Sequence, residues 1–549
     1  MPQFRRRYMN ALRYRSQVLV IGSGLAGCAA ALTMADRGFD VHLLMPTEEL
    51  DGGNSIMAQG GIVFTTDPED QKSLEHDMFV AGHDYNYDVA VRFLAEHGGE
   101  AVQSMLIDKL HVPFDRNDSG RWDMTLEGGH AVPRIAHCAD YTGRSIIEHI
   151  HAAVAKHPNI TVLGGRSAVD LVTSEHHVCS TACHYQLTNR CLGAYAFNEA
   201  TQNVELHLAE MTVLATGGVG QVYLYSTNNP WATGSGISMA HRAGVRLANM
   251  EFMQFHPTGL FNHAQQIPLL TEALRGEGAH VVNSRGERFV SRYDPRGDLA
   301  PRDVVSQAIV SEMLATGENH MLLDCSTLEC DVTRRFPTVF ESCRKIGIDM
   351  RTQPLPIVPV AHYFCGGILV DLRGRTTLDR LYAVGECSCT GIHGANRLAS
   401  TSLLEALLWG ISAGRDIADR LPAEHFDTQI FSEIADWKHP GNEHNDDPAL
   451  IAQDWATIRH IMWNYVGIIR TEMRKLAKQQ EADAAKKAEA SNSPDSSKDS
   501  SQSDSKDSTK DSSSQSGSSS DKSGSSSSSD SSDKSGIGAA DNAATGDSQ

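Results

Sequence analysis

The sequence predicts an α/β protein whose main part is a doubly wound, Rossmann-like domain, and two observations support this prediction. An apolar run at residues 18–21 leads into a GxGxxG motif at residues 22–27, and a helix-forming segment follows directly. Such glycines permit a tight turn, close approach of the backbone to a pyrophosphate, and close packing of the helix on the strand. Further strands are predicted at residues 41–44, 212–218 and 381–386, so that distant segments build one dinucleotide-binding domain.

The spacing of apolar residues predicts several further elements. Residues 73–110 place apolar side chains at helical spacing, which predicts helices there. Residues 160–163, 194–197 and 204–208 are expected to form hairpin strands. A long helix is expected to begin at Ser402.

Charge and cysteine content narrow the class of protein. The 549 residues include 48 Lys and Arg against 68 Asp and Glu, a net charge of −20, which argues against nucleic acid as a partner. The eleven cysteines lack the spacing of a disulfide scaffold, and the start of the chain lacks the apolar segment of a secretory leader. No apolar run approaches the roughly 20 residues needed to cross a membrane. We therefore expect a cytoplasmic protein that has no membrane partner.

The two ends of the chain differ in composition from the rest. Residues 1–16 contain five arginines and form a basic leader. Residues 488–549 consist almost entirely of Ser, Asp, Lys, Gly and Ala, which predicts a disordered tail, because such a segment has too little apolar surface to pack. Residues 422–487 are expected to be helical. Their apolar side chains are predicted to share one stripe, formed by Trp455, Ile458, Met462, Tyr465 and Ile469.

Two polar clusters allow more than one interpretation. The run from His176 to His184 contains two cysteines three residues apart and histidines at both ends, so it is either a zinc site or a variable hairpin insertion. The absence of a second ligand pair at the usual distance favours the insertion. Glu127 precedes two glycines, and it either belongs to a loop turn or is a functional carboxylate on a close-fitting loop.

Polar residues suited to a small anionic substrate cluster between residues 250 and 362. Three of them lie directly beside a glycine or proline, and together the six suggest a second domain inserted into the first. They are His256, Thr271, Glu272, Arg275, Arg302 and His362.

Several runs are similar to motifs of the flavoprotein family of succinate dehydrogenase and fumarate reductase, and most of all to its aspartate-oxidising members. These runs are Ala58-Gln59-Gly60-Gly61, Phe255-His256-Pro257-Thr258, residues 271–278, Ala300-Pro301-Arg302-Asp303, Ala361-His362-Tyr363 and His393-Gly394-Ala395-Asn396-Arg397. The resemblance implies an FAD-binding domain at residues 17–249 and 363–421, with an inserted α+β capping domain at residues 250–362. It also implies a C-terminal helical domain, of which residues 422–487 are an incomplete part.

The resemblance also assigns roles to individual residues. It implies that the substrate carboxylates bind His256, His362, Arg397 and Thr271, with support from Glu272 and Arg275. Arg302 resembles the proton donor of fumarate reduction. The residues expected to contact FAD are Gly22, Ser23, Gly24, Leu25, Ala26, Gly27, Asn54, Ser55, Ala58, Gln59, Gly60, Gly61, Ala168, Val169, Thr216, Gly217, Ser235, Glu386, Ser402 and Leu403.

The implied reaction is the FAD-dependent oxidation of L-aspartate to iminosuccinate, with hydride transfer to flavin N5 and dioxygen or fumarate as the electron acceptor. It is the first step of NAD biosynthesis toward quinolinate, which implies a functional link to a quinolinate synthase. Residues 54–57 contain no histidine where membrane-bound relatives attach FAD, so we expect FAD without a covalent bond. Glu127 favours aspartate, because a carboxylate there can pair with the substrate ammonium.

Two other functions remain open on the sequence. A soluble fumarate reductase or succinate-oxidising flavoprotein would use the same dicarboxylate-binding motifs. An inactive flavin-binding structural protein is suggested by the incomplete C-terminal domain.

Overall fold

The main sheet carries the first glycine motif at the end of its central strand. In the computed structural model, which describes residues 13–181, 185, 188–262, 267–438 and 448–470, the strand order is β6-β2-β1-β9-β8-β7, and β16 also pairs with β9. Its strands are β1 (Arg13–Ile21), β2 (Val41–Leu44), β6 (Ile160–Leu163), β7 (Arg166–Thr173), β8 (Cys191–Asn198), β9 (Asn203–Leu214) and β16 (Leu381–Ala383). β1 pairs in parallel with both β2 and β9, which is the arrangement of the predicted doubly wound domain.

Two details of this sheet differ from the sequence predictions. Residues 160–163 were expected in a hairpin, but β6 pairs in parallel with β2 at the edge of the sheet. Residues 204–208 and 212–214 were expected in separate strands, but both belong to β9, which is antiparallel to β8 and parallel to β1 and β16. Both errors arise because the pairing partner of a strand depends on distant residues rather than on its own pattern.

The helices of this part pack against the sheet and against one another. They are α1 (Leu25–Ala35), α2 (Pro68–Ala81), α3 (Asp88–Ala101), which continues as the π-helix η2 (Val102–Lys109), α4 (Thr142–Lys156), α5 (Ser174–His177), α7 (Ser235–Arg242) and α12 (Ser402–Ala423). α12 lies directly on α1, and a Cβ atom at Gly410 would come within 2.6 Å of the Ala26 carbonyl oxygen. A larger residue at Gly410 would therefore push the two helices apart. Val89, one of the apolar residues of the predicted helical segment 73–110, is nevertheless exposed at the start of α3.

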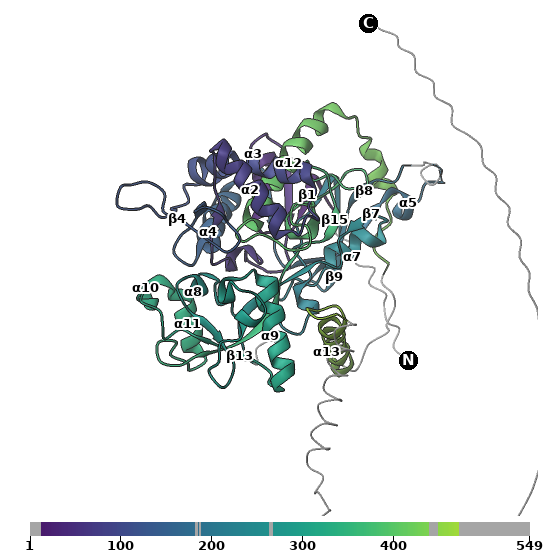
Figure 1. Cartoon of the computed structure of the whole chain (residues 1–549). Helices are drawn as coiled ribbons and strands as arrows, with labels where there is room; N and C mark the ends of the chain where they lie inside the picture. Colours follow the sequence, from purple (N-terminus) through teal and green to yellow (C-terminus); the bar gives the residue numbers. More distant parts are fainter. Residues whose placement is uncertain (1–12, 182–184, 186–187, 263–266, 439–447, 471–549) are drawn as a thin grey trace, which may run out of the picture. The chain divides into compact units, whose positions relative to one another are not determined.

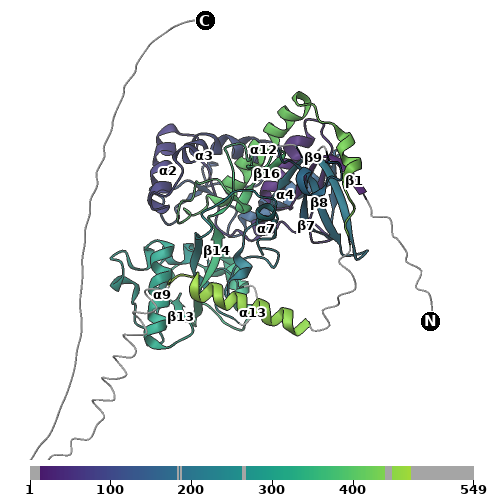
Figure 2. The same cartoon turned by 90° about the vertical axis from the view of Figure 1, so that its right-hand side faces the viewer.

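A second sheet, with its own core, belongs to the inserted segment. Its order is β11-β14-β13-β12, and its apolar core consists of residues between Leu260 and Ile357. Its elements are β11 (Met253–Leu260), α8 (Ala273–Gly276), β12 (His280–Val282), α9 (Arg302–Thr316), β13 (Met321–Asp324), α10 (Val332–Arg335), α11 (Pro337–Lys345) and β14 (Leu355–Phe364). In both views, α9 and β13 lie below the group formed by α2, α3 and α12 (Figures 1 and 2).

Two smaller sheets complete the fold. One three-stranded sheet has the order β10-β15-β17 and another has the order β3-β5-β4. Their strands are β3 (Ile62–Val63), β4 (Met124–Thr125), β5 (Ile135–Ala136), β10 (Leu247–Ala248), β15 (Gly367–Leu369) and β17 (Ser388–Cys389). All the described residues fall within one compact unit.

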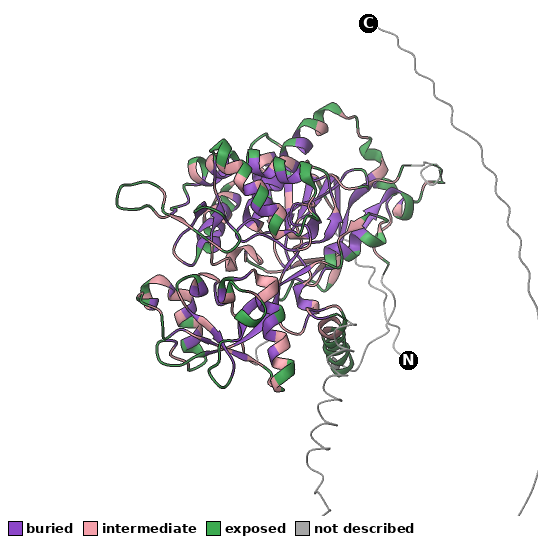
Figure 3. Ribbon diagram, viewed as in Figure 1, coloured by how far each residue is buried: buried purple, intermediate pink, exposed green. Residues whose placement is uncertain are grey.

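The ends of the described chain modify two predictions. β1 begins at Arg13, so the last four residues of the predicted leader belong to a strand, and residues 1–12 lie outside the described residues. The predicted late helix is α13 (Pro448–Tyr465), but its apolar residues do not form a buried stripe, since Trp455, Ile458 and Tyr465 are exposed. Figure 3 shows α13 largely in green, the colour of exposed residues. The predicted tail, residues 488–549, lies outside the described residues.

No helix among the described residues is long and apolar enough to span a membrane.

Candidate active site

A large cavity lies where the carboxyl ends of the main strands meet the inserted sheet. Its volume is about 1080 Å³, at the upper end of the roughly 300–1000 Å³ of common small-molecule sites. Its lining includes β1 with the first glycine loop, the loop at residues 51–61, the ends of β9 and β16, and side chains from β11 and β14. A cavity of this size can hold an extended nucleotide cofactor together with a small substrate.

The first glycine loop forms one wall of the cavity at the amino end of α1. Gly22 has φ of +119°, and a Cβ there would lie 2.1 Å from the Ala215 carbonyl oxygen, so the turn requires glycine. Gly24 precedes α1 and has no side chain to cap it, and among the first N–H groups that of Leu25 donates to Ser55 Oγ at 3.3 Å. The start of α1 therefore offers backbone N–H groups and a positive helix end to a phosphate group. Gly27 does not line the cavity, and its missing side chain permits packing, since a Cβ would lie 2.1 Å from the Gly22 carbonyl oxygen.

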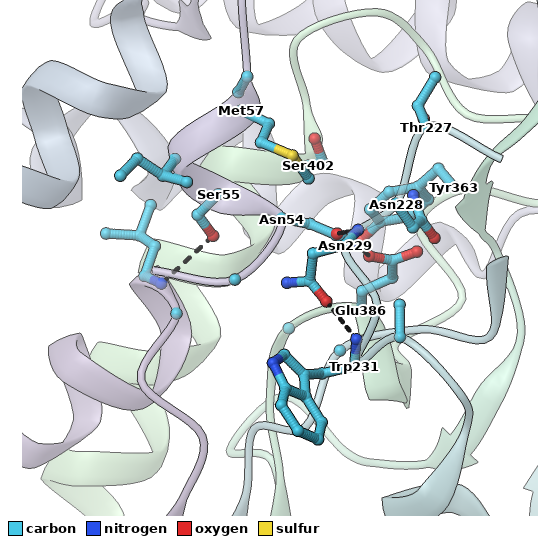
Figure 4. Close-up of a pocket in the computed structure, with 18 of the residues that line it drawn as sticks. Asn54, Ser55, Met57, Thr227, Asn228, Asn229, Trp231, Tyr363, Glu386 and Ser402 are labelled. Carbon is cyan, nitrogen blue, oxygen red and sulfur yellow. Dashed lines mark hydrogen bonds between the residues drawn. The ribbon is translucent and has the colours of Figure 1, made fainter. Parts of the chain in front are cut away.

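The second loop is tied to the end of β16 by Asn54. Asn54 Nδ2 donates to Glu386 Oε2 at 3.1 Å, and Asn54 Oδ1 accepts from the Asn229 backbone N–H at 2.9 Å. In Figure 4 the side chains of Asn54, Asn229 and Glu386 lie close together. Burial raises the pKa of Glu386 to about 7, even though the Phe364 N–H and Asn54 donate hydrogen bonds to it. A hydroxyl-rich ligand at this place would supply further donors to this carboxylate.

The residues expected to contact a flavin lie mostly around this one cavity. Gly27 and Val169 are the two exceptions, and the backbone oxygen of Val169 accepts a hydrogen bond from Arg242 instead. Ser402 and Leu403 open α12 at the cavity wall, so this helix also directs its positive end toward the site. Ser235 lines the cavity as well, at the first position of α7. The glycine turn, the positive amino end of α1 and the acceptor at Glu386 together fit FAD.

An arginine–glutamate cluster forms the capping side of the cavity. Arg302 Nε donates to Glu272 Oε2 at 2.6 Å, and Arg275 Nη2 lies 3.3 Å from Glu272 Oε1. Burial by itself would raise the pKa of Glu272, but Arg302 and Arg275 outweigh it and hold this pKa below its ordinary value. Arg275 is buried behind Glu272 and does not line the cavity. Glu272 is therefore an anion already neutralised by two guanidinium groups.

Two histidines face each other across the neighbouring strands β11 and β14. The rings of His256 and His362 meet edge to face, with 5.2 Å between their centroids. His362 Nδ1 lies 3.0 Å from Thr227 Oγ1, and Thr258 N–H donates to His256 Nδ1 at 3.3 Å. Burial and the nearby arginines hold both histidine pKa values well below the ordinary range. Both rings are therefore neutral near pH 7 and can donate hydrogen bonds without adding charge.

Arg397 supplies a cation from the loop before α12. Its guanidinium lies over the Tyr363 ring at 4.7 Å from the centroid, and its Nη1 donates to Ser402 Oγ at 3.1 Å. Burial and the charge of Arg302 lower its pKa to about 10, so it remains charged at neutral pH. Arg397, Arg302, both histidines and Thr271 thus line the same cavity.

Glu127 enters the cavity from the FAD-binding side. Ser400 Oγ donates to Glu127 Oε2 at 2.6 Å. The loop that carries Glu127 also lies close to Glu272. Its next residue must be glycine, because a Cβ at Gly128 would lie 2.3 Å from Glu272 Oε1. Burial raises the pKa of Glu127, partly offset by Ser400 and Arg302. A cationic ligand group beside Glu127 would stabilise its charged form.

Several residues that line the cavity or support its side chains escaped the sequence analysis. Gln254 donates from Nε2 to the Arg397 carbonyl oxygen at 2.7 Å, and it accepts from Arg302 Nη1 at 3.2 Å. Its place two residues before His256 on one strand was a signal that could have identified it. Tyr363 follows His362 directly, whereas Ser400 and Thr227 carried no local signal.

The described residues of the run from His176 to His184 do not support a zinc site. Among the described residues, no group of three or more His, Cys, Asp or Glu side chains is placed to hold a metal ion. His177 Nδ1 accepts a hydrogen bond from the Thr173 N–H, and Cys179 is exposed. Cys183 and His184 lie outside the described residues.

Comparisons with known proteins agree with this geometry. Residues 17–403 match the FAD binding domain family. L-aspartate oxidase of Pseudomonas aeruginosa is 43% identical over 84% of this chain and 85% of its own length, and that of Yersinia pestis is 44% identical over the same shares. Among solved structures, E. coli quinol fumarate reductase FrdA superposes with a TM-score of 0.73 at 26% identity, over 87% of this chain and 83% of its own.

The doubly wound sheet, the glycine loops and the inserted capping sheet therefore define an FAD-binding flavoprotein. Within this class, the chain belongs to the L-aspartate oxidase family, which shares its fold with the fumarate reductase flavoproteins.

Proposed function

We propose that this protein oxidises L-aspartate to iminosuccinate, with dioxygen or fumarate as the electron acceptor. The observation that carries the proposal is Glu127, a carboxylate placed near Arg302 and Arg397 in the same cavity as the groups expected to hold the substrate carboxylates. The names of the relatives at 43–44% identity support the same substrate.

The charges of the site favour an amino dicarboxylate. Three guanidinium groups interact with the carboxylates of Glu127 and Glu272: those of Arg275 and Arg397, which are buried, and that of Arg302, which is partly buried. Among these five groups alone, one positive charge is left over, which matches the net charge of −1 on aspartate. Succinate carries two negative charges, and it has no ammonium group to face Glu127.

Each polar residue has a separate task in the proposed mechanism. Arg397, Thr271 and the neutral His256 and His362 hold the two substrate carboxylates. Glu127 pairs with the ammonium, and its raised pKa suits it to accept the proton that the ammonium must lose. FAD, when bound, supplies the hydride acceptor.

Arg302 is better suited to the reverse direction than to proton abstraction. A guanidinium is a poor base, because its pKa ordinarily lies above about 12. With fumarate as acceptor, however, Arg302 is the proton donor that the family resemblance implies. Glu272 Oε2, at 2.6 Å from Arg302 Nε, can pass on to it a proton taken from Arg275, whose Nη2 lies 3.3 Å from Glu272 Oε1.

The wider setting is also part of the proposal. We expect a quinolinate synthase to consume the reactive imine product. The described cysteines are all free thiols, which supports a reducing compartment and hence the cytoplasm.

Turnover tests the proposed activity directly. The FAD-loaded protein should release hydrogen peroxide with L-aspartate under air, and not with succinate. Oxidation of succinate without oxidation of aspartate would establish the fumarate reductase alternative instead. Loss of both activities in a protein that retains FAD would support the inactive structural protein.

A further inference from the structure

A buried carboxylate behind the cavity has no task in the mechanism above. Glu405 lies in the first turn of α12, and 1% of its surface is exposed. Three side chains surround it: Tyr363 OH donates to Oε2 at 2.5 Å, Thr390 Oγ1 donates to Oε1 at 2.6 Å, and His393 Nε2 lies 2.9 Å from Oε2. A buried carboxylate with so many partners fixes the positions of the groups that bind it.

Tyr363, the first of the three partners of Glu405, supports Arg397. The Tyr363 hydroxyl is anchored on Glu405, and the Tyr363 ring carries the Arg397 guanidinium on its face. The His393 ring packs edge to face against the Tyr363 ring, with 5.1 Å between centroids. Glu405 and His393 together therefore determine the plane on which Arg397 rests.

His393, another partner of Glu405, closes the loop that carries Arg397. His393 and Glu405 stand at the two ends of a segment that contains Arg397 and Ser400. Ser400 has a left-handed backbone with φ of +55°, an uncommon conformation that the surrounding contacts must hold. Both ends of this segment are tied by the contact between His393 and Glu405.

Arg397 itself has few other supports. Its Nε is buried without a hydrogen-bond partner among the described residues, and its Nη1 bonds Ser402. The Tyr363 ring is thus a main determinant of its direction.

We propose that Glu405 is a positioning residue for Arg397, acting through the Tyr363 ring and through the loop that His393 closes. The proposal rests on the proposed function in one respect, since it takes Arg397 to be a carboxylate-binding group. It adds that the affinity for dicarboxylates depends on a side chain that does not touch them.

Binding of malonate to the FAD-loaded protein tests this proposal without any turnover. Malonate has only one carbon between its two carboxylates, so it cannot be dehydrogenated to an alkene as succinate can. Glu405→Gln keeps the size of the side chain but removes its charge, and it should raise the Kd for malonate about tenfold by calorimetry. That change corresponds to about 1.4 kcal/mol.

Asp416 provides a matched control on the same helix. It is also buried, accepts a hydrogen bond from a tyrosine, Tyr382, at 2.8 Å, and pairs with Arg375. Tyr382, unlike Tyr363, does not line the cavity. Asp416→Asn should lower the melting temperature and leave the malonate Kd unchanged. An equal loss of malonate affinity in both variants would show a general structural effect and overturn the proposal.

The Arg397→Lys background separates positioning from structure. Lysine keeps the charge but not the planar group that stacks on the ring. In this background Glu405→Gln should change the malonate Kd less than twofold, and a repeated tenfold loss would refute the proposal. If Glu405→Gln does not fold, Tyr363→Phe removes the same anchor and should raise the Kd similarly; an unchanged Kd would refute the proposal.

The same measurements distinguish this proposal from the proposed function. A protein that binds malonate but does not oxidise aspartate would disprove the proposed function and leave the role of Glu405 testable by binding. A wild-type protein that binds no malonate would overturn the role of Glu405.

Discussion

Ser400 holds Glu127 against the loop at residues 51–61, because the Ser400 hydroxyl oxygen contacts both. Ser400 Oγ donates to Glu127 Oε2 at 2.6 Å, and it accepts from the Gly61 N–H at 3.2 Å. A Cβ on Gly60 would lie 2.4 Å from Glu127 Oε1, so the carboxylate and the loop are in direct contact. Glu127 is therefore fixed at one place in the cavity rather than free to move with its loop.

The Glu127→Gln variant should lose activity with aspartate in particular. A charge-assisted hydrogen bond contributes about 1.5–3 kcal/mol, so kcat/KM for aspartate should fall roughly 10- to 100-fold. Fumarate reduction should stay constant or rise, because fumarate carries no ammonium group. Steady-state rates with both substrates measure the ratio.

Glu312→Gln serves as a control for this variant. Glu312 is a buried carboxylate in α9, paired with Arg292, and it does not line the cavity. Its removal should leave the ratio of the two activities unchanged. Normal aspartate oxidation by Glu127→Gln would remove the main structural argument for aspartate as the substrate.

FAD should be released by acid denaturation, because residues 54–57 provide no histidine for a covalent link. Asn54 is instead engaged by Glu386 and Asn229. Precipitation with acid should leave a yellow supernatant with the absorbance of FAD and a colourless pellet. Flavin colour that stays with the pellet would show a covalent bond.

Local patterns were sufficient to predict the elements that carry the cofactor. Glycines at positions such as Gly22 must adopt a conformation that other residues rarely reach, so they mark a turn without any knowledge of the remaining chain. The helix at Ser402 was equally visible from its apolar spacing. The parallel partner of β6 and the continuity of β9 were not, because both depend on strands far away in the sequence.

The site follows the same rule. His256, His362, Arg302 and Arg397 stand in recognisable motifs, and the structure brings them around one cavity. The supports of these residues were invisible, because they join distant positions. Glu405 and Tyr363 are 42 positions apart in the sequence, and no local pattern predicts a contact between them.

Acidity should stabilise the FAD-free protein through Glu386. Burial raises its folded-state pKa to about 7 from the ordinary 4.5, so the folded protein binds this proton more tightly than the unfolded chain. The resulting stability is fully present below about pH 4.5 and is lost as the pH rises toward 7. Melting temperatures of the FAD-stripped protein, measured at pH 5 and pH 7.5, should show this loss.

Glu386→Gln isolates the contribution of this one carboxylate from all others that titrate. The FAD-stripped variant should lose less stability than wild type between pH 5 and pH 7.5. Identical pH dependence in the two proteins would mean that Glu386 keeps an ordinary pKa.

A capping contact between the two parts of the molecule should control substrate affinity. Asp140, in the loop before α4, accepts from both the N–H and the hydroxyl of Thr338 at 2.9 Å each, and Thr338 lies in the first turn of α11. Asp140 therefore caps a helix of the inserted segment from the FAD-binding side, and both residues line the cavity.

Asp140→Ala should loosen the inserted segment and raise KM for aspartate. Loss of such a cap costs about 0.5–2 kcal/mol, which corresponds to a rise in KM of roughly 2- to 30-fold. Asp331 is the matched control, since it caps α10 through Thr333 with the same pair of bonds, at 3.0 and 2.7 Å, but within the inserted segment alone. Asp331→Ala should lower the melting temperature and leave KM unchanged. Equal KM values in the two variants would show that the contact between Asp140 and Thr338 serves stability and not closure of the cavity.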